Sequence, residues 1–174
     1  MSSRQFSLTA PALDHLVRTA GSLYDEARRC AHAGCWRAAL ILIGSALEAG
    51  IVATACCLEP ELRQRGLWPS YGAPTRWTLG QAIALATTAD WLPAEQSHAD
   101  SIASLAGDVG DAVTFLNDVR KVAVHAGAHA REQITPDFDD IAHMQPTYDV
   151  FDGIAAVVFE RLARAVHTEL GAPS

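Results

Sequence analysis

The residues best suited to chemistry in this sequence are Arg120 and His125, which stand five positions apart near the end of an apolar stretch. Histidine can accept or donate a proton near neutral pH. The planar guanidinium of arginine can hold two phosphate oxygens and stabilise negative charge that develops in a transition state. Together the two side chains suit a reaction that combines proton transfer with charge stabilisation at a phosphate.

RNA fits this pair as a substrate, because its 2′-hydroxyl is a nucleophile held next to the scissile phosphate. The protein then needs to supply neither a nucleophile nor a metal ion, since a histidine can move the proton and an arginine can bind the phosphate oxygens. Such cleavage leaves a 2′,3′-cyclic phosphate and a 5′-hydroxyl. The pair therefore favours metal-independent cleavage of RNA, with no cofactor.

Helix geometry restricts how Arg120 and His125 can act together. Five residues of an α-helix rotate by about 500°, so the two side chains point about 140° apart in one regular helix. They can share a site if the helix ends or bends near Gly127. They can also do so if a second copy of the chain brings its own pair across a two-fold interface. We therefore expect a homodimer.

Both residues also have purely structural interpretations. Arg120 can form an ion pair with Glu48 or Asp118, and His125 can interact favourably with the dipole at the end of a helix. His125 and His129 stand four residues apart, a spacing that can hold a metal on a helix. Glycine at position 127 weakens that interpretation and Glu132 is the one candidate for a third ligand, so we expect no metal site.

The elements that position these residues are predicted to be helices. Thr9 can cap a first helix that ends near His32. Residues 36–57 are apolar nearly all round, which is typical of the central helix of a bundle. Residues 78–81 read as a capping box, residues 102–123 follow a helical spacing, and a final helix is expected to begin near Pro146. These patterns predict an all-α, up-and-down bundle of four to five helices.

The apolar run 38–57 has one charged residue, Glu48, and could be mistaken for a membrane span. A carboxylate in the middle of a bilayer costs about 2.5–3.5 kcal/mol, and no second apolar run follows to shelter it. We therefore expect a buried helix and no membrane association. Glu48 is then an internal partner for an arginine or a residue that faces a functional cleft.

Two segments read as connections within a single domain that spans residues 1–174. The first, 59–77, is rich in proline and glycine and reads as a loop or lid. Its arginines and aromatic rings can bind and stack on a nucleotide, pin the loop to the body, or bind a small ligand. The candidate RNA-binding residues are Arg63, Arg65, Arg76 and Trp77. The second segment, 128–145, contains an acidic run and reads as a connector.

Composition limits the classes of function. Of 174 residues, 49% are hydrophobic and the formal net charge is −7, so phosphate contacts must be local or assembled from two subunits. Residues 1–7 contain no apolar run, which predicts no signal peptide and a cytoplasmic location.

The four cysteines, at positions 30, 35, 56 and 57, cannot all share one metal on helices of this length, and we expect buried, reduced thiols.

An apolar helix with Leu47-Glu48, then Thr78-Leu-Gly-Gln, then Arg120-Lys-Val-Ala-Val-His125-Ala-Gly resembles the HEPN superfamily of all-α domains. Its motif is an arginine, usually followed by a polar residue, with four to six residues before a histidine. The resemblance would cover most of residues 9–170. It implies an up-and-down bundle that dimerises so that two motifs face each other.

In active members of the superfamily, the resemblance implies a metal-independent endoribonuclease, often a toxin or a component of phage defence that can have an antitoxin partner. It implies catalytic roles for Arg120 and His125, with Asn117, Lys121, His129 and Glu48 in support. Active members often have Asn, Asp or His where this chain has lysine at position 121. That departure, with the acidic charge, favours the alternative of a non-catalytic protein-interaction module.

Overall fold

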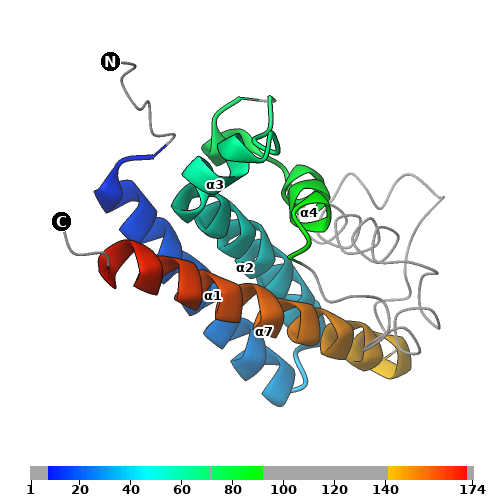
Figure 1. Cartoon of the computed structure of the whole chain (residues 1–174). Coiled ribbons are helices and arrows are strands. Elements are labelled where there is room, and N and C mark those ends of the chain that lie inside the picture. Colours follow the sequence, from blue (N-terminus) through cyan, green and yellow to red (C-terminus); the bar gives the residue numbers. More distant parts are fainter. Residues whose placement is uncertain (1–7, 71, 92–140, 172–174) are drawn as a thin grey trace.

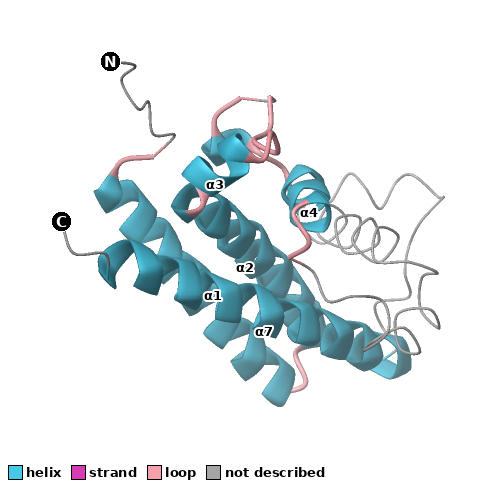
Figure 2. Ribbon diagram, in the orientation of Figure 1, coloured by secondary structure: helices cyan, strands magenta, loops and turns pink. Residues whose placement is uncertain are grey.

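The computed structural model describes residues 8–70, 72–91 and 141–171 (Figure 1). Every regular element in these ranges is helical, as Figure 2 shows. The elements are α1 (Ala10–His32), α2 (Trp36–Cys57), α3 (Glu59–Gln64), the 3-10 turn η1 (Pro74–Arg76), α4 (Leu79–Thr88) and α7 (Ile141–Gly171). The predicted all-α class and helical-bundle character are confirmed. The helix predicted over 102–123 lies outside the described residues.

Helix α1 begins and ends at local signals in the sequence. The Thr9 hydroxyl accepts a hydrogen bond from the Ala12 backbone N–H at 3.4 Å, as predicted for the cap. After His32 the chain turns at Gly34, whose φ of +73° is a conformation that glycine adopts without steric cost. The Cys35 N–H bonds to the Cys30 carbonyl at 2.8 Å, which closes the helix end. This tight turn sends α2 back along α1.

Helix α2 lies at the centre of the described bundle, where it packs against α1, α7 and α4 (Figure 1). It is long and apolar enough to cross a membrane by length and composition, but 67% of its most apolar stretch is buried inside the protein. Thr54, buried in this helix, donates its hydroxyl hydrogen to the Gly50 carbonyl at 2.8 Å, which satisfies its polar group. The prediction of a central core helix over 36–57 is confirmed.

Helices α2 and α7 run parallel, side by side (Figure 1). At their N-terminal ends the rings of Trp36 and Tyr148 lie 6.0 Å apart, between centroids. Towards their C-terminal ends Cys57 packs in one apolar cluster with Leu162. Midway, a Cβ built on Gly50 would lie 3.3 Å from a methyl carbon of Val158, so the absence of a side chain at Gly50 permits this close approach.

Two predicted boundaries are wrong in detail. The stretch 59–77 contains helix α3 and the turn η1 rather than loop alone, and the predicted connector 128–145 overlaps α7. Helix α7 begins at Ile141, ahead of the predicted start near Pro146. A proline this close to a helix start removes a single intrahelical hydrogen bond, and burial of Met144 and Phe151 offsets that loss.

Candidate functional site

The predicted catalytic motif falls outside the residues whose structure is described, so its geometry remains a prediction. The residues concerned are Asn117, Arg120, Lys121, His125 and His129. Of the predicted supporting residues, Glu48 is described: it lies in α2 and is partly buried. A half-buried carboxylate on an otherwise apolar helix is consistent with either interpretation of Glu48, the internal ion pair or the functional cleft.

The arginines predicted to bind RNA are largely neutralised by neighbours on their own helix. Arg63 Nε lies 2.7 Å from Glu59 Oε1, and the Glu59 side chain is only 7% exposed. Arg65 Nη1 lies 3.1 Å from Glu61 Oε1. Both pairs have the i, i+4 spacing, which places opposite charges on one helix face. Arg76, in η1, is exposed. Paired arginines present a weaker field to phosphate than free ones.

The tryptophans of this region fasten the loop to the protein body. Trp77 is 4% exposed, and its indole N–H donates to the Gly72 carbonyl at 3.1 Å. The ring of Trp68 packs against that of Trp77 at 5.5 Å, and the Arg63 guanidinium lies 4.9 Å above the Trp68 ring. The buried ring of Trp77 offers no face on which a nucleobase could stack, so its predicted RNA contact does not agree with its position.

A polar cluster joins α1 to α7, and sequence reasoning did not find it. The hydroxyl of Tyr24 donates to the backbone carbonyl of Asp152 at 3.5 Å, and that of Tyr148 donates to the Asp152 carboxylate at 3.5 Å. Tyr24 also stacks on Phe159 with ring centroids 4.7 Å apart. Burial, and then the Asp152 charge, raise the pKa of Tyr24 to about 12, and the same two causes raise the pKa of Tyr148. Both tyrosines are therefore protonated at neutral pH and act as structural donors.

Tyr24 and Asp152 lie far apart in the sequence and leave no local pattern, which is why this polar cluster was missed.

The cysteines agree in part with the expectation of buried, reduced thiols. Cys56 and Cys57 are buried, but Cys30 is partly buried and Cys35 is exposed. Burial, with the neighbouring Cys57 and Glu59, raises the pKa of Cys56 to about 12, so this thiol is unreactive at neutral pH. No group of three His, Cys, Asp or Glu residues within the described ranges can hold a metal.

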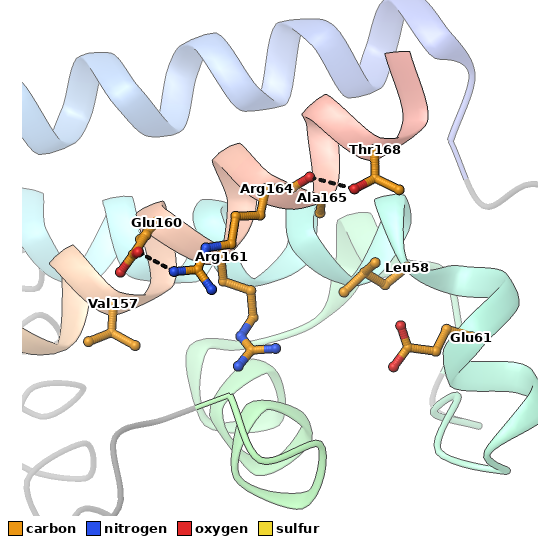
Figure 3. Close-up of a pocket in the computed structure, with 8 residues that line it drawn as sticks. All are labelled: Leu58, Glu61, Val157, Glu160, Arg161, Arg164, Ala165 and Thr168. Carbon is orange, nitrogen blue, oxygen red and sulfur yellow. Dashed lines mark hydrogen bonds and ion pairs between the residues drawn. The ribbon is translucent and has the colours of Figure 1, made fainter. Parts of the chain in front are cut away.

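The described residues also form a hollow of about 250 Å³ beside α3 and the C-terminal half of α7 (Figure 3). Charged side chains of both signs line it. Arg164 pairs with Glu160, and Thr168 donates its hydroxyl hydrogen to the Arg164 carbonyl at 2.9 Å. No sequence motif marked this hollow, because its two walls are about a hundred residues apart along the chain.

The fold and these sites define an all-α helical bundle. Comparison with known proteins finds no matching family model, no matching curated protein and no matching solved structure.

Proposed function

We propose that the chain is a HEPN-like protein that binds RNA and cleaves it without a metal ion. The observation that carries this proposal is the sequence Arg120-Lys-Val-Ala-Val-His125 in a chain whose described elements are all helical. Its biological setting would be that of a cytoplasmic toxin or phage-defence component, with an antitoxin or other protein as its partner.

The directions of the described helices support the bundle topology that the proposal requires. In an up-and-down bundle of four main helices, the second and fourth run parallel and the first runs opposite to both. Helices α2 and α7 run parallel and α1 turns back into α2 through a tight turn. The helix that the sequence predicts over 102–123 would be the third, and it would carry Arg120.

Each residue of the motif has a chemical role in the proposal. His125 would move the proton of the 2′-hydroxyl or of the leaving oxygen. Arg120 would bind the phosphate and stabilise its transition-state charge, and Lys121 would hold the backbone of the RNA. Glu48 would orient Arg120. A two-fold homodimer would bring two such motifs together. Arg120 of one protomer could then act with His125 of the other, although the two side chains of one helix point apart.

Further residues complete the proposed RNA surface. Asn117 and His129 would flank the motif as hydrogen-bonding neighbours. The exposed Arg76 would make local contacts with RNA phosphates, because an acidic chain can attract RNA only through focused cations. Arg63 and Arg65 would contribute less, since each pairs with a glutamate. Trp77 is left out of this surface because its ring is buried.

The proposal is tested by incubating the purified full-length chain with RNA in the presence of a chelator. Cleavage should occur, and Arg120→Ala and His125→Ala should each lower its rate by about a hundredfold or more. Arg18→Ala is the matched control, since Arg18 is an exposed arginine of α1 that pairs with Asp14. An unchanged rate of cleavage in both variants would contradict the proposed catalytic roles of Arg120 and His125.

A second candidate is a non-catalytic HEPN-like module that binds a protein partner. The observation that favours it is the neutralisation of Arg63 and Arg65 by glutamates, together with the net charge of −7. This candidate predicts no cleavage of RNA, a partner that co-purifies in a fixed ratio, and a partner complex that tolerates His125→Ala. Cleavage by the isolated chain would exclude it.

A further inference from the structure

The hollow between α3 and α7 has the features of a ligand site, and its interpretation does not depend on the proposed function. Its volume of about 250 Å³ is just below the range of about 300–1,000 Å³ typical of pockets for drug-sized ligands, so it suits a smaller molecule. Leu58 and Glu61 form one wall, and Val157, Arg161 and Ala165 of α7 form another (Figure 3).

Arg161 has hydrogen-bonding capacity that the described protein does not use. A guanidinium carries five N–H donors. Arg161 Nη2 donates to the Asp90 carbonyl at 3.5 Å, the limit of a hydrogen bond, and Nε is buried with no partner in the described residues. Nε itself lies out of a ligand's reach, but the exposed outer edge of a guanidinium, formed by Nη1 and Nη2, can hold a carboxylate through two hydrogen bonds. The α7 wall therefore offers a place for a ligand carboxylate.

The opposite wall offers the complementary charge. In Figure 3 the carboxylate of Glu61 points across the hollow toward the side where the Arg161 guanidinium lies. One oxygen of Glu61 accepts from Arg65 at 3.1 Å. A carboxylate has about four acceptor positions, so this half-exposed pair leaves Glu61 able to accept hydrogen bonds from a ligand ammonium group.

Apolar side chains and balanced charge narrow the choice of ligand. Leu58, Val157 and Ala165 supply apolar surface to the hollow. Its four charged lining residues are two arginines and two glutamates, so their formal charges cancel. A phosphate group would gain no net attraction from this lining, because both glutamates oppose both arginines, whereas a ligand that carries one charge of each sign would be attracted at both ends.

We propose that this hollow binds a small zwitterion, an α-amino acid with an aliphatic side chain. The ligand carboxylate would bind Arg161, its ammonium group would bind Glu61, and its side chain would pack on Leu58 and Val157. Such a site would let the amino acid hold α3 and α7 together, because it bonds to Glu61 of α3 and Arg161 of α7.

The probe is L-leucine, added to the full-length chain and followed by amide chemical shifts in NMR spectra. Two matched analogues each lack one charge: 4-methylvalerate has no ammonium group and 3-methylbutylamine has no carboxylate. Leucine should shift the amides around the hollow in a saturable way, and each analogue should bind about tenfold more weakly or worse. Inorganic phosphate is the comparison for a simple anion site.

Substitutions on the two walls complete the test. Arg161→Gln and Glu61→Gln should each weaken leucine binding by about tenfold or more, and Arg161→Lys should have a smaller effect because it keeps the charge but loses the planar fork. Arg18→Gln, in an exposed pair on α1, is the control and should bind as the wild type does. Circular dichroism confirms that each variant is folded.

Three results would overturn the proposal: leucine that causes no saturable shifts, 4-methylvalerate or phosphate that binds as tightly as leucine, or an unchanged affinity in the folded Arg161→Gln variant.

Discussion

The two sides of α2 are held by different kinds of contact. Helices α1 and α7 pack on it through long apolar faces, with Phe151 and other large side chains fully buried. The segment 58–91 also buries apolar side chains in this core, Leu62 and Ile83 among them, but its own shape is fixed in addition by polar contacts within the segment. These are the Trp77 indole with the Gly72 carbonyl, the Arg63–Glu59 pair and the Thr78–Gln81 capping box. We call the side of α2 covered by α1 and α7 the helical side, and the side covered by the segment 58–91 the fastened side.

The arginines and tryptophans of the segment 58–91 allow two interpretations, binding of a nucleotide or attachment of the segment to the rest of the protein. Arginine and tryptophan in a proline-rich stretch predict a surface that binds nucleotides, but they serve equally well to hold such a stretch in place. On the fastened side Trp77 and Trp68 do the second. Substitutions on each side of α2 test this difference.

Truncation in the helical side should have the largest effect. Phe151 is 1% exposed in the core of α7, so Phe151→Ala removes a ring and leaves a cavity. We expect the free energy of unfolding to fall by about 3–5 kcal/mol, measured by urea denaturation. Phe151→Leu, which fills most of the volume, should cost less. A loss below about 1 kcal/mol for Phe151→Ala would contradict the burial of this ring.

Overpacking between α2 and α7 comes next. A Cβ at Gly50 would lie 3.3 Å from Val158 and 3.5 Å from Phe159, so Gly50→Leu should destabilise the protein by about 1–3 kcal/mol. Gly21 is a comparison glycine in α1, where an added Cβ would have nothing within 4 Å, and Gly21→Ala should stabilise the protein by about 0.5–1 kcal/mol. Equal effects at both glycines, in thermal unfolding, would rule out the close approach of α2 and α7.

A smaller effect is expected on the fastened side. Trp77→Phe keeps an aromatic ring but removes the donor to Gly72, and should cost about 0.5–1.5 kcal/mol. Amide hydrogen exchange should accelerate in residues 72–77 while the core of α2 keeps its protection. Trp68→Phe, which keeps a ring beneath Arg63, is the control. Unchanged exchange in Trp77→Phe would mean that this indole does not fasten the loop.

The smallest effect concerns pH. Burial and Asp152 raise the pKa of Tyr24 from 10.0 to about 12, so the unfolded chain loses this proton at lower pH than the folded one. The stability that Tyr24 contributes is therefore complete below pH 10 and is lost as the pH rises through 12. Tyr24→Phe should flatten the alkaline decline of the unfolding free energy, and an unchanged slope would contradict the shift.

Local signals in the sequence were sufficient for much of the helical framework. The Thr9 cap, the Thr78–Gln81 capping box and the apolar run 36–57 each depend on neighbouring residues, and each is confirmed. The start of α7 was predicted too late because proline is favoured in a first turn, and the residues before Pro146 have no strong apolar pattern.

Contacts between distant segments could not be read from the sequence. The Tyr24–Asp152 bond spans 128 positions, and the two walls of the α3–α7 hollow come together only through the parallel packing of α2 and α7. The arginine pairs of α3 follow the i, i+4 rule and could have been predicted from the spacing of Glu59 and Glu61. The motif at Arg120 and His125 rests on the sequence and stays a prediction.

The central claim is that the RNA itself supplies the nucleophile, which Arg120 and His125 activate. The most direct measurement uses two RNA oligonucleotides, identical except that one has hydrogen in place of the 2′-hydroxyl at the cleaved position, each incubated with the full-length chain and a chelator. We predict that the unmodified RNA is cut to a 2′,3′-cyclic phosphate and a 5′-hydroxyl, and that the modified RNA is not cut at that position. Equal cleavage of both oligonucleotides, or cleavage of neither, would contradict the account.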